Sequence, residues 1–410
     1  MDIDMNKGIP VDPESYQQVC ERNVAPSVIP PSSRLAIDVL RTLDAALPVW
    51  RGFERQAQGT LYQNSLWCRA WVETVGQHLN VKPRIVLARS PAGTPQFILP
   101  LQIRKRHGLQ VLEWLGSPHH NYGHGLFDPG FMPAAGQWFE DHWDRVLDEI
   151  GGFDAIALTE MPERLAGIEH PLLGLTNLRA ANPSFGLRLE ADFEQLYARK
   201  KSGERRRAAR KHANALAQLG PVSFGLPGSK AELHALIDVM FGQQQSRLAE
   251  LGVYRVFGPA ERLFVHRLAE LQNEYDPILA PYHLTCDGKV LAVMLGGLHG
   301  NCYWALISSL APGPLRKHSP GDLALRNTIE ACCQRGLTMI DFSAGDSSYK
   351  RAWADDVIDM RVIFRGRNLA GVMWAGAMAL RLLLKRQIKG SPILLGLSLW
   401  LRRRLFAKRS

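Results

Sequence analysis

The thirteen residues from Asp341 to Trp353 (DFSAGDSSYKRAW) gather side chains that can move protons and hold charge. They include two carboxylic acids, a phenol, an amine and an indole, at Asp341, Asp346, Tyr349, Lys350 and Trp353. An apolar pattern typical of a buried strand, residues 337–343, leads directly into them. Enzymes of the α/β and α+β classes place their sites in such loops beyond strand ends. A loop closed by an ion pair, such as Asp341 with Arg351, has the same composition, so both interpretations stay open here.

The elements around this stretch repeat the order of an earlier part of the chain. The first set comprises strands at 84–89, 96–104 and 109–116, a helix around 137–150 and a strand at 153–160. The second set comprises two strands around the hairpin signal Asp287-Gly288, a strand at 302–310, a helix from Ser319 and the strand at 337–343. Three strands, a helix and a strand, found twice, predict two related α/β modules rather than one alternating βαβ array.

The loop before the second predicted helix is a candidate anion site. Six of its residues carry the signal: Arg316, Lys317, Ser319, Pro320, Gly321 and Asp322. We expect Ser319 to be the N-cap of the helix, with Pro320 at its first position and Asp322 completing a capping-box-like arrangement. Free N–H groups and the helix dipole would then face a phosphate. Many helices begin in this way without a ligand, and the Asp322 carboxylate would oppose an anion.

A basic helix is predicted between the two modules, at 195–220. Eight Lys or Arg residues crowd positions 199–211, and Glu204 alone opposes them. The pattern fits a solvated helix face, a surface that captures a phosphorylated or nucleotide-bearing ligand through residues such as Arg205, or an RNA-binding surface. Because no RNP-type aromatic pattern accompanies the charges, nucleic acid is the less favoured partner.

The first module contains a loop rich in histidine, LGSPHHNYGHG at 115–125. His119, His120 and His124 lie within six residues, but no carboxylate or cysteine stands at the spacing of a zinc site, so we expect no metal. With Tyr122, they favour a polar loop that lines a cleft between the modules. His299 and His318 fall in turns of the second module, where each could be a base or a solvated turn residue.

Length and composition bound the class of protein. A chain of 410 residues, 46% hydrophobic and 21% charged, predicts a globular protein of two domains. Six cysteines without CxxC spacing favour a reducing, cytoplasmic compartment. The first 35 residues hold acids and prolines and no apolar run, so we expect a loose N-terminal tail without a secretory signal.

The basic character of the chain is regional. Twelve of its 49 Lys and Arg residues lie between Arg361 and Ser410, where no acid occurs, which leaves 37 basic against 39 acidic residues elsewhere. The apolar runs at 369–380 and 392–401 are too short to span a bilayer and are interrupted or followed by basic residues. The tail favours peripheral attachment to an anionic membrane, with a docking helix for a partner protein as the alternative.

Five segments, in this order, resemble the GNAT-like acyltransferases associated with bacterial cellulose and exopolysaccharide synthesis, the CelD-like or BioF2-like acetyltransferases, which are related to the FemAB peptidoglycan acyltransferases. They are SLWCRAWVETVG, LGSPHHNYG, KKSGERRRAARK, SPGDLAL and DFSAGDSSYKRAW, and the resemblance covers about residues 66–364. It implies an α/β (α+β) fold of two tandem acyl-CoA N-acyltransferase modules with mixed sheets flanked by helices. The phosphate loop of ordinary GNAT enzymes, Q/R-x-x-G-x-G/A, is absent from this chain.

The resemblance also implies a division of the chain and a donor. The expected units are an N-terminal tail at 1–45, a first module at 46–185, a second module at 186–367 and a basic tail at 368–410. The second module would hold acetyl-CoA or another acyl-CoA as a co-substrate, with no permanently bound cofactor. The residues expected to contact this donor are Arg205, Arg316, Lys317, Ser319 and Gly321.

Acyl transfer needs a base for the attacking amine or hydroxyl and donors for the oxyanion. We expect Asp341 or Asp346 to be the base, Tyr349 to protonate the leaving thiolate, and Lys350 to pair with a phosphate or carbonyl oxygen. The residues expected to contact the acceptor are His119, His120, Tyr122, Trp304 and Trp353.

The predicted function is an acyl-CoA-dependent acyltransferase acting on a sugar, lipid or cell-envelope precursor, in the cytoplasm and peripherally at the inner face of the membrane. Two alternatives stay open. One is a non-catalytic scaffold of a membrane polysaccharide synthase, which would bind a membrane or a partner but no CoA. The other is a FemAB-type transferase that uses aminoacyl-tRNA, whose binding would fall steeply with salt.

Overall fold

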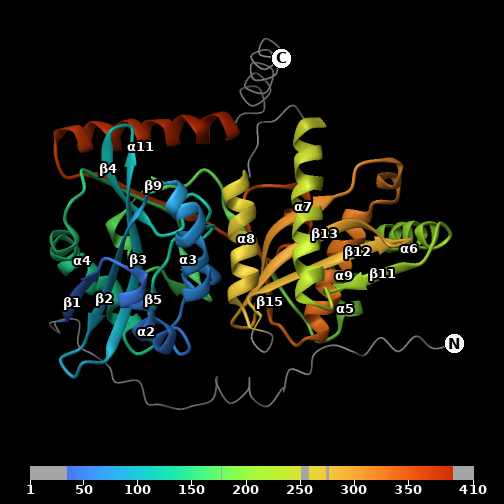
Figure 1. Ribbon diagram of the computed structural model, residues 1–410, viewed down its shortest axis with the longest axis horizontal. Coiled ribbons are helices and arrows are strands. Elements are labelled where there is room, and N and C mark those ends of the chain that lie inside the picture. Colours follow the sequence, from blue (N-terminus) through green and yellow to red (C-terminus); the bar gives the residue numbers. More distant parts are fainter. Residues whose placement is uncertain (1–34, 177, 251–257, 274–276, 391–410) are drawn as a thin grey trace, which may run out of the picture.

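Two mixed β-sheets lie beside each other, with helices around them, in the computed structural model, which describes residues 35–176, 178–250, 258–273 and 277–390 (Figure 1). The first sheet has eight strands: β1 (Ala36–Leu40), β2 (Lys82–Arg89), β3 (Pro95–Arg106), β4 (Leu109–Trp114), β6 (Ala155–Pro162), β17 (Met360–Gly366) and β9 (Leu178–Arg179) in spatial order, with β5 (Leu126–Phe127) paired to β3. The second has seven: β11 (Val222–Gly225), β12 (Leu279–Cys286), β13 (Lys289–His299), β14 (Cys302–Leu310), β15 (Met339–Ala344), β10 (Ser184–Arg188) and β16 (Asp356–Ile358). The strands β7 (Arg164–Leu165) and β8 (Ile168–Glu169) form a separate hairpin.

The helices divide between the two halves. The first half contains α2 (Leu43–Phe53), α3 (Ser65–Trp71) and α4 (Met132–Ile150). The second contains α5 (Phe193–Lys200), α6 (Gly203–Ala217), α7 (Lys230–Glu250), α8 (Pro259–Leu271), α9 (Pro320–Gln334) and α10 (Ser348–Trp353). The last helix, α11 (Leu369–Gly390), returns to the first half and runs along its edge, as the red helix at the top of Figure 1 shows.

The predicted repeat of elements is confirmed. β2, β3, β4, α4 and β6 follow the same order as β12, β13, β14, α9 and β15. In each repeat the third and fourth strands pair in parallel over three residues, which brings Glu113 opposite Ala157 and Trp304 opposite Asp341. The predicted hairpin is also confirmed, because Asp287 and Gly288 both have positive φ, as a two-residue turn of type I′ requires.

Each sheet includes one strand that, in the sequence, follows the repeat of the other sheet. β10 follows the first repeat in sequence but pairs with β15, and β17 follows the second repeat but pairs with β6. The proposed division at residue 185 stays a prediction, although β17 lies in the first sheet and the range 186–367 assigns it to the second module. Each exchanged strand covers a sheet edge that would otherwise expose unpaired N–H and C=O groups.

Two expectations about local structure need correction. The predicted loose tail at 1–45 does not include residues 36–45, because β1 pairs with β2 along all five of its residues and α2 begins at Leu43. Residues 1–34 lie outside the described part of the chain. The basic helix predicted at 195–220 is broken into α5 and α6, because Lys201 has extended backbone angles and the Ser202 hydroxyl caps α6 by accepting from the Arg205 N–H.

The two halves share one apolar core. Tyr62 and Trp67 of the first half pack in the same cluster as Phe264 and Trp304 of the second. The rings of Trp67 and Phe264 pack edge to face with their centroids 4.9 Å apart, and the rings of Tyr62 and Trp304 do so with their centroids 6.0 Å apart. The junction between the halves is therefore fixed by aromatic packing as well as by the exchanged strands.

This packing gives the first prediction. A methyl group added at Gly297 in β13 would lie 2.4 Å from Leu61 Cδ2, in the 3₁₀ turn Leu61–Gln63, and 3.1 Å from the Ile278 carbonyl oxygen. We expect Gly297→Ala to lower the free energy of unfolding by about 1–3 kcal/mol, measured by urea denaturation. Gly242→Ala is the control, since its methyl meets no atom within 4 Å on the exposed side of α7, and we expect a rise of up to about 1 kcal/mol. Equal effects of the two changes would contradict the described packing.

Candidate active site

The candidate site begins where β14 and β15 separate. Their parallel pairing ends at Trp304 and Asp341, although β14 continues to Leu310 and β15 to Ala344. Beyond that point the backbone edges of the two strands face a wedge instead of each other. Backbone groups on such an edge can bind an extended ligand in the manner of an added strand.

Asp341 lies buried at the start of this wedge. Its carboxylate accepts hydrogen bonds from the Tyr122 hydroxyl and from the Ser343 N–H, the latter at 2.6 Å. The Tyr122 hydroxyl also hydrogen-bonds to Ser184 Oγ at 2.6 Å. Burial raises the pKa of Asp341 to about 6, against the lowering effect of the hydrogen bonds from Tyr122 and Ser343. At neutral pH the carboxyl is ionised yet close to its pKa, which suits a general base.

A second chain of hydrogen bonds crosses the junction beside it. Ser343, a non-glycine residue with φ of 62°, donates from Oγ to the Ala305 carbonyl oxygen at 2.7 Å. Tyr62 places its hydroxyl 3.2 Å from Ser343 Oγ, and Asn121 donates to that hydroxyl at 2.8 Å. Trp304 packs edge to face against Tyr122 at 5.2 Å. These contacts bring the histidine-rich loop of the first half directly to the end of β15.

Lys350 closes the turn that follows β15. Its Nζ donates to the carbonyl oxygens of Ser343 and Ala344, each at 3.0 Å. Burial lowers the pKa of Lys350 to about 8, while the charges of Asp341 and Asp346 act in the opposite direction. A positive charge therefore remains near Asp341 at neutral pH, and the side chain also holds the backbone of the turn in place.

Asp346 and Tyr349 lie farther out on the same turn. Arg351 donates from Nε to Asp346 Oδ1 at 2.7 Å and from Nη2 to Oδ2 at 2.5 Å, and this pairing lowers the pKa of Asp346. The open interpretation in which Arg351 pairs with Asp341 is therefore wrong, because the exposed Asp346 is nearer in the chain and reachable without burying the guanidinium. Tyr349 is partly exposed, packs edge to face on Phe342, and has its pKa raised by burial.

Two predicted acceptor residues lie outside this arrangement. Trp353 stacks on Tyr197 at 5.9 Å under the Lys201 amine, within the core of the second sheet and not in the shared core. His120 is buried in the first half, with Nε2 3.3 Å from the Thr159 carbonyl oxygen, and burial lowers its pKa to about 4.

His119 faces a cavity of about 210 Å³ at the junction. Most of the wall is apolar, with Trp67, Phe264, Leu306 and Ile307 among the lining residues. One corner is polar, where His119 Nε2 lies 3.2 Å from Glu261 Oε1 beside Asn121. Because the Trp71 indole donates to His119 Nδ1, the neutral imidazole carries its proton on Nε2 and donates it to Glu261. Burial lowers the pKa of His119, which favours this neutral form.

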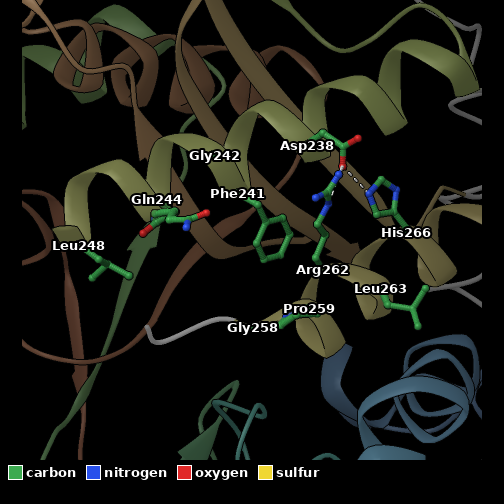
Figure 2. Close-up of a pocket in the computed structure, with 11 residues that line it drawn as sticks. Asp238, Phe241, Gly242, Gln244, Leu248, Gly258, Pro259, Arg262, Leu263 and His266 are labelled. Carbon is green, nitrogen blue, oxygen red and sulfur yellow. Dashed lines mark hydrogen bonds and ion pairs between the residues drawn. The ribbon is translucent and has the colours of Figure 1, made fainter. Parts of the chain in front are cut away.

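A second cavity lies between α7 and α8 and has a volume of about 380 Å³. Figure 2 shows the residues that line it. Arg262 and His266 both contact Asp238 there, at 2.7 and 2.6 Å. Phe241 lines this cavity and the smaller one.

Within the described residues, no group of three His, Cys, Asp or Glu side chains is arranged to hold a metal ion.

Ser319 occupies the N-cap position of α9, as predicted, but the expected capping by its side chain is absent. Ser319 has left-handed backbone angles, and its side chain makes no capping hydrogen bond, because it ends the 3₁₀ turn Pro314–His318 by donating its N–H to the Arg316 carbonyl. Pro320 does open α9, as expected. The N–H groups of Asp322 and Leu323 already bond to the Ser319 carbonyl, which leaves the start of α9 with fewer donors for an anion.

Tertiary contacts nevertheless bring the two predicted basic regions together. α6 packs against the 3₁₀ turn Pro314–His318, where the rings of His212 and His318 lie 6.4 Å apart. Arg205 and Lys317 are both exposed on these neighbouring elements, whereas Arg316 is ion-paired with Glu250 at 2.6 Å. A nearby cavity of about 200 Å³ is lined by Arg206, whose buried Nε has no hydrogen-bond partner among the described residues.

Four polar residues of the junction were not predicted: Tyr62, Asn121, Ser184 and Ser343. Asn121 and Ser343 lie within the segments that carry the family resemblance, so their positions offered a signal. Tyr62 and Ser184 lie in segments with no motif, and only the folded chain brings them to Asp341 and Ser343.

The site gives a prediction on pH dependence. Because the pKa of Asp341 is raised in the folded protein, the stabilisation from its neutral form is complete below the unfolded pKa of about 4 and is lost as pH rises through about 6. The free energy of unfolding of the wild type, minus that of Asp341→Asn, should fall by about 3 kcal/mol over this range. Urea denaturation at several pH values measures it, and a difference that does not change with pH would contradict the assignment.

The family model described as an acetyltransferase (GNAT) domain matches residues 203–351, which include α9, β14 and β15. No protein with a curated description matches the sequence.

Several solved structures are similar to this chain over about four fifths of its length. FemX is 10% identical in sequence, with 79% of this chain and 96% of FemX covered and a TM-score of 0.53. L-PGS from Bacillus licheniformis is 11% identical, with 81% and 96% covered and a TM-score of 0.50. A tandem GNAT protein from the clavulanic acid biosynthesis pathway is 10% identical, with 82% and 100% covered and a TM-score of 0.45. The predicted fold of two tandem modules with mixed sheets flanked by helices is confirmed, and residues 203–351 match an acetyltransferase (GNAT) domain.

Proposed function

We propose that this protein is an acyltransferase that uses acyl-CoA, acetyl-CoA first among them, to acylate an amine or hydroxyl of a sugar, lipid or exopolysaccharide precursor. One observation carries the proposal. The buried Asp341 carboxylate lies where β14 and β15 separate, inside the segment that matches the acetyltransferase (GNAT) domain. The CelD-like resemblance supports the choice of acceptor class.

The donor would enter the wedge between β14 and β15. Its thioester carbonyl would reach backbone N–H groups on the strand edges, which stabilise the oxyanion. Its phosphates would lie toward the positive surface where α6 meets the loop before α9, and Arg205 and Lys317 are exposed there. This arrangement takes the place of the phosphate loop that the sequence lacks, since the charges come from two elements distant in the chain.

The acceptor would approach from the cavity at the junction. Asn121 lines that cavity and also bonds to Tyr62, whose hydroxyl reaches Ser343 beside Asp341. In this mechanism Asp341 accepts the proton of the attacking amine or hydroxyl as its bond to the acyl carbon forms. The C–S bond then breaks, and the thiolate takes a proton from Tyr349 or from solvent. Tyr122 is a positioning residue, because it orients the Asp341 carboxylate.

The assignment of the base can be tested by two matched changes. Release of CoA thiol is followed with acetyl-CoA and a panel of amine and sugar acceptors. We expect Asp341→Asn to lower kcat by about 10²–10⁴-fold with a smaller effect on donor affinity, because the base acts only in the transition state. Asp346→Asn should stay within about twofold of the wild type, because Asp346 is exposed and paired with Arg351.

The pH profile gives an independent readout of the same base. For the wild type, log kcat/KM should fall with unit slope below about pH 6, where Asp341 becomes protonated. Loss of turnover in Asp346→Asn but not in Asp341→Asn would move the base to Asp346.

The donor is tested by calorimetric titration with acetyl-CoA. We expect binding that weakens by about tenfold or more when Arg205 and Lys317 are changed together to Glu. Lys105→Glu is the control, because Lys105 is an exposed cation on β3 of the first sheet. A folded wild type that binds no acyl-CoA but binds tRNA, with affinity falling steeply with salt, would favour the aminoacyl-tRNA alternative. A protein that binds neither ligand would favour the scaffold.

The predicted place of action also remains a proposal. We propose that the protein works peripherally at the inner face of a membrane, where precursors of exopolysaccharides are assembled. None of the described helices is long and apolar enough to cross a bilayer.

A further inference from the structure

The last helix, α11, packs on the first sheet through one face. Gly371, Trp374 and Ala375 are buried there, and Trp374 meets the Phe364 ring of β17 edge to face at 6.4 Å. The fit is close, because a methyl group at Gly371 would lie 1.9 Å from the Asp154 carbonyl oxygen. The contacts of α11 with β17 and β6 fix which side of the helix points outward.

The outward side of α11 is apolar. Six large apolar side chains, between 44% and 78% exposed, recur at intervals of three, four and seven residues: Leu369, Val372, Met373, Leu380, Leu383 and Leu384. They are six of the fourteen exposed large apolar residues in the described part of the chain. Scattered exposed leucines need no explanation, but large apolar side chains that recur on one side of a helix, with only Gly376 and Ala377 exposed between the two groups, indicate a surface that meets another apolar phase. The helix lies along the outer edge of the molecule in Figure 1.

Positive charge accompanies the stripe. Arg381, Lys385 and Arg386 are exposed on the same helix, and no acidic residue occurs between Arg361 and the end of the chain. A second copy of this face would bring like charges together, which disfavours self-association. An anionic lipid surface satisfies both features, because the leucines enter the acyl boundary while the basic side chains reach the headgroups.

We infer that α11 binds the surface of an anionic membrane, with the stripe Leu369–Leu384 facing the lipid. The last turn of the helix then brings the membrane close to the candidate site. Lys389 donates to Asn182, two residues before Ser184, and its charge acts on Asp346, which follows β15. The part of the inference that concerns substrate rests on the proposed function: the acceptor is an amphiphile, with its amine or hydroxyl presented at the lipid surface.

Co-sedimentation of the full chain with sucrose-loaded vesicles tests the inference. One set of vesicles is phosphatidylcholine alone, and the other is an equimolar mixture with phosphatidylglycerol. We expect strong binding to the anionic vesicles, weaker binding to the neutral ones, and a loss of binding as salt screens the charges. Absence of binding to either vesicle would overturn the inference.

Three variants locate the binding surface. Leu380→Asp with Leu384→Asp should lower the partition coefficient on anionic vesicles by about tenfold or more, since two leucines no longer enter the bilayer. Arg381→Glu with Lys385→Glu should lower it by about fivefold per residue and reduce the preference for anionic lipid. Leu263→Asp, an exposed leucine on α8, is the matched control and should bind like the wild type.

The outcomes separate this inference from the proposed function. If the leucine variant binds vesicles as well as the wild type does, α11 is not the membrane surface, whether or not residues 391–410 bind lipid. If the variants lose vesicle binding but all proteins bind acetyl-CoA equally, the membrane surface is separate from the donor site, as we expect. Vesicle binding without any acyl-CoA binding would leave α11 as the lipid surface and contradict the proposed donor. A stripe that instead packs against another part of the chain would show as unchanged vesicle binding with a lower midpoint of thermal unfolding in the leucine variant.

Discussion

The exchange of β10 and β17 between the two sheets is the constraint on which the rest of the structure depends. β10 follows the first repeat in the sequence but pairs with β15 of the second sheet, and β17 follows the second repeat but pairs with β6 of the first sheet. The halves are therefore joined by ladders of backbone hydrogen bonds as well as by side chains. The exchange also sets the site. Ser184, the first residue of β10, bonds to Tyr122, which in turn holds Asp341 of β15. A junction fixed in this way keeps a buried carboxylate at one position, because the loop that carries Tyr122 is itself held against β10 and β15.

Burial at that junction accounts for the electrostatics of the site. Water is excluded from Asp341 and Lys350, so each is displaced toward its neutral form, with the pKa of the acid near 6 and that of the amine near 8. Hydrogen bonds from Tyr122 and Ser343 stabilise the ionised carboxylate and offset part of the cost of burying its charge. Burial and the charge of Asp341 raise the pKa of the Cys302 thiol, which therefore stays protonated and is a poor nucleophile. Within the proposed function, these values favour direct transfer to an acceptor over an acyl-cysteine intermediate.

The two repeats use the same separation of strands differently. In the first half, the loop at 115–125 fills the space beyond β4 and β6, where the Gly123 N–H bonds to the Glu160 carbonyl and His120 reaches that of Thr159. A methyl group at Gly123 would lie 2.3 Å from Trp114 Nε1, so the filling is tight. In the second half, the backbone pairing of β14 with β15 ends at Trp304 and Asp341. Beyond that point, the hydrogen bond described between these two strands is the one from Ser343 Oγ to the Ala305 carbonyl. The first repeat thus forms a wall of the site, and the second provides its opening.

The sequence by itself determined the local elements and their order. Alternating apolar runs, the Asp287-Gly288 turn and the proline that opens α9 act over a few residues, so the repeated strands and helices could be predicted within a few positions. It also indicated Asp341, Lys350 and Tyr122, because their types stand out in segments that resemble acyltransferases. The local signal at Ser319 predicted the N-cap position but not the backbone angles there, because Ser319 also ends the preceding 3₁₀ turn and has left-handed angles in which its side chain makes no capping hydrogen bond.

Only the tertiary structure decided which residues meet. Tyr122 and Asp341 are 219 positions apart, and Tyr62 and Ser343 are 281 apart, so no spacing in the chain could pair them. The return of β17 to the first sheet and the contact of α6 with the loop before α9 are likewise set by which edges and faces remain to be covered. Arg351 pairs with the exposed Asp346 because Asp341 is buried. The local sequence pattern does not predict which of the two aspartates is buried. Burial and long-range contact depend on the whole fold, whereas propensity and turn chemistry depend on a few neighbours, and this difference in range divides what the sequence determined from what the fold decided.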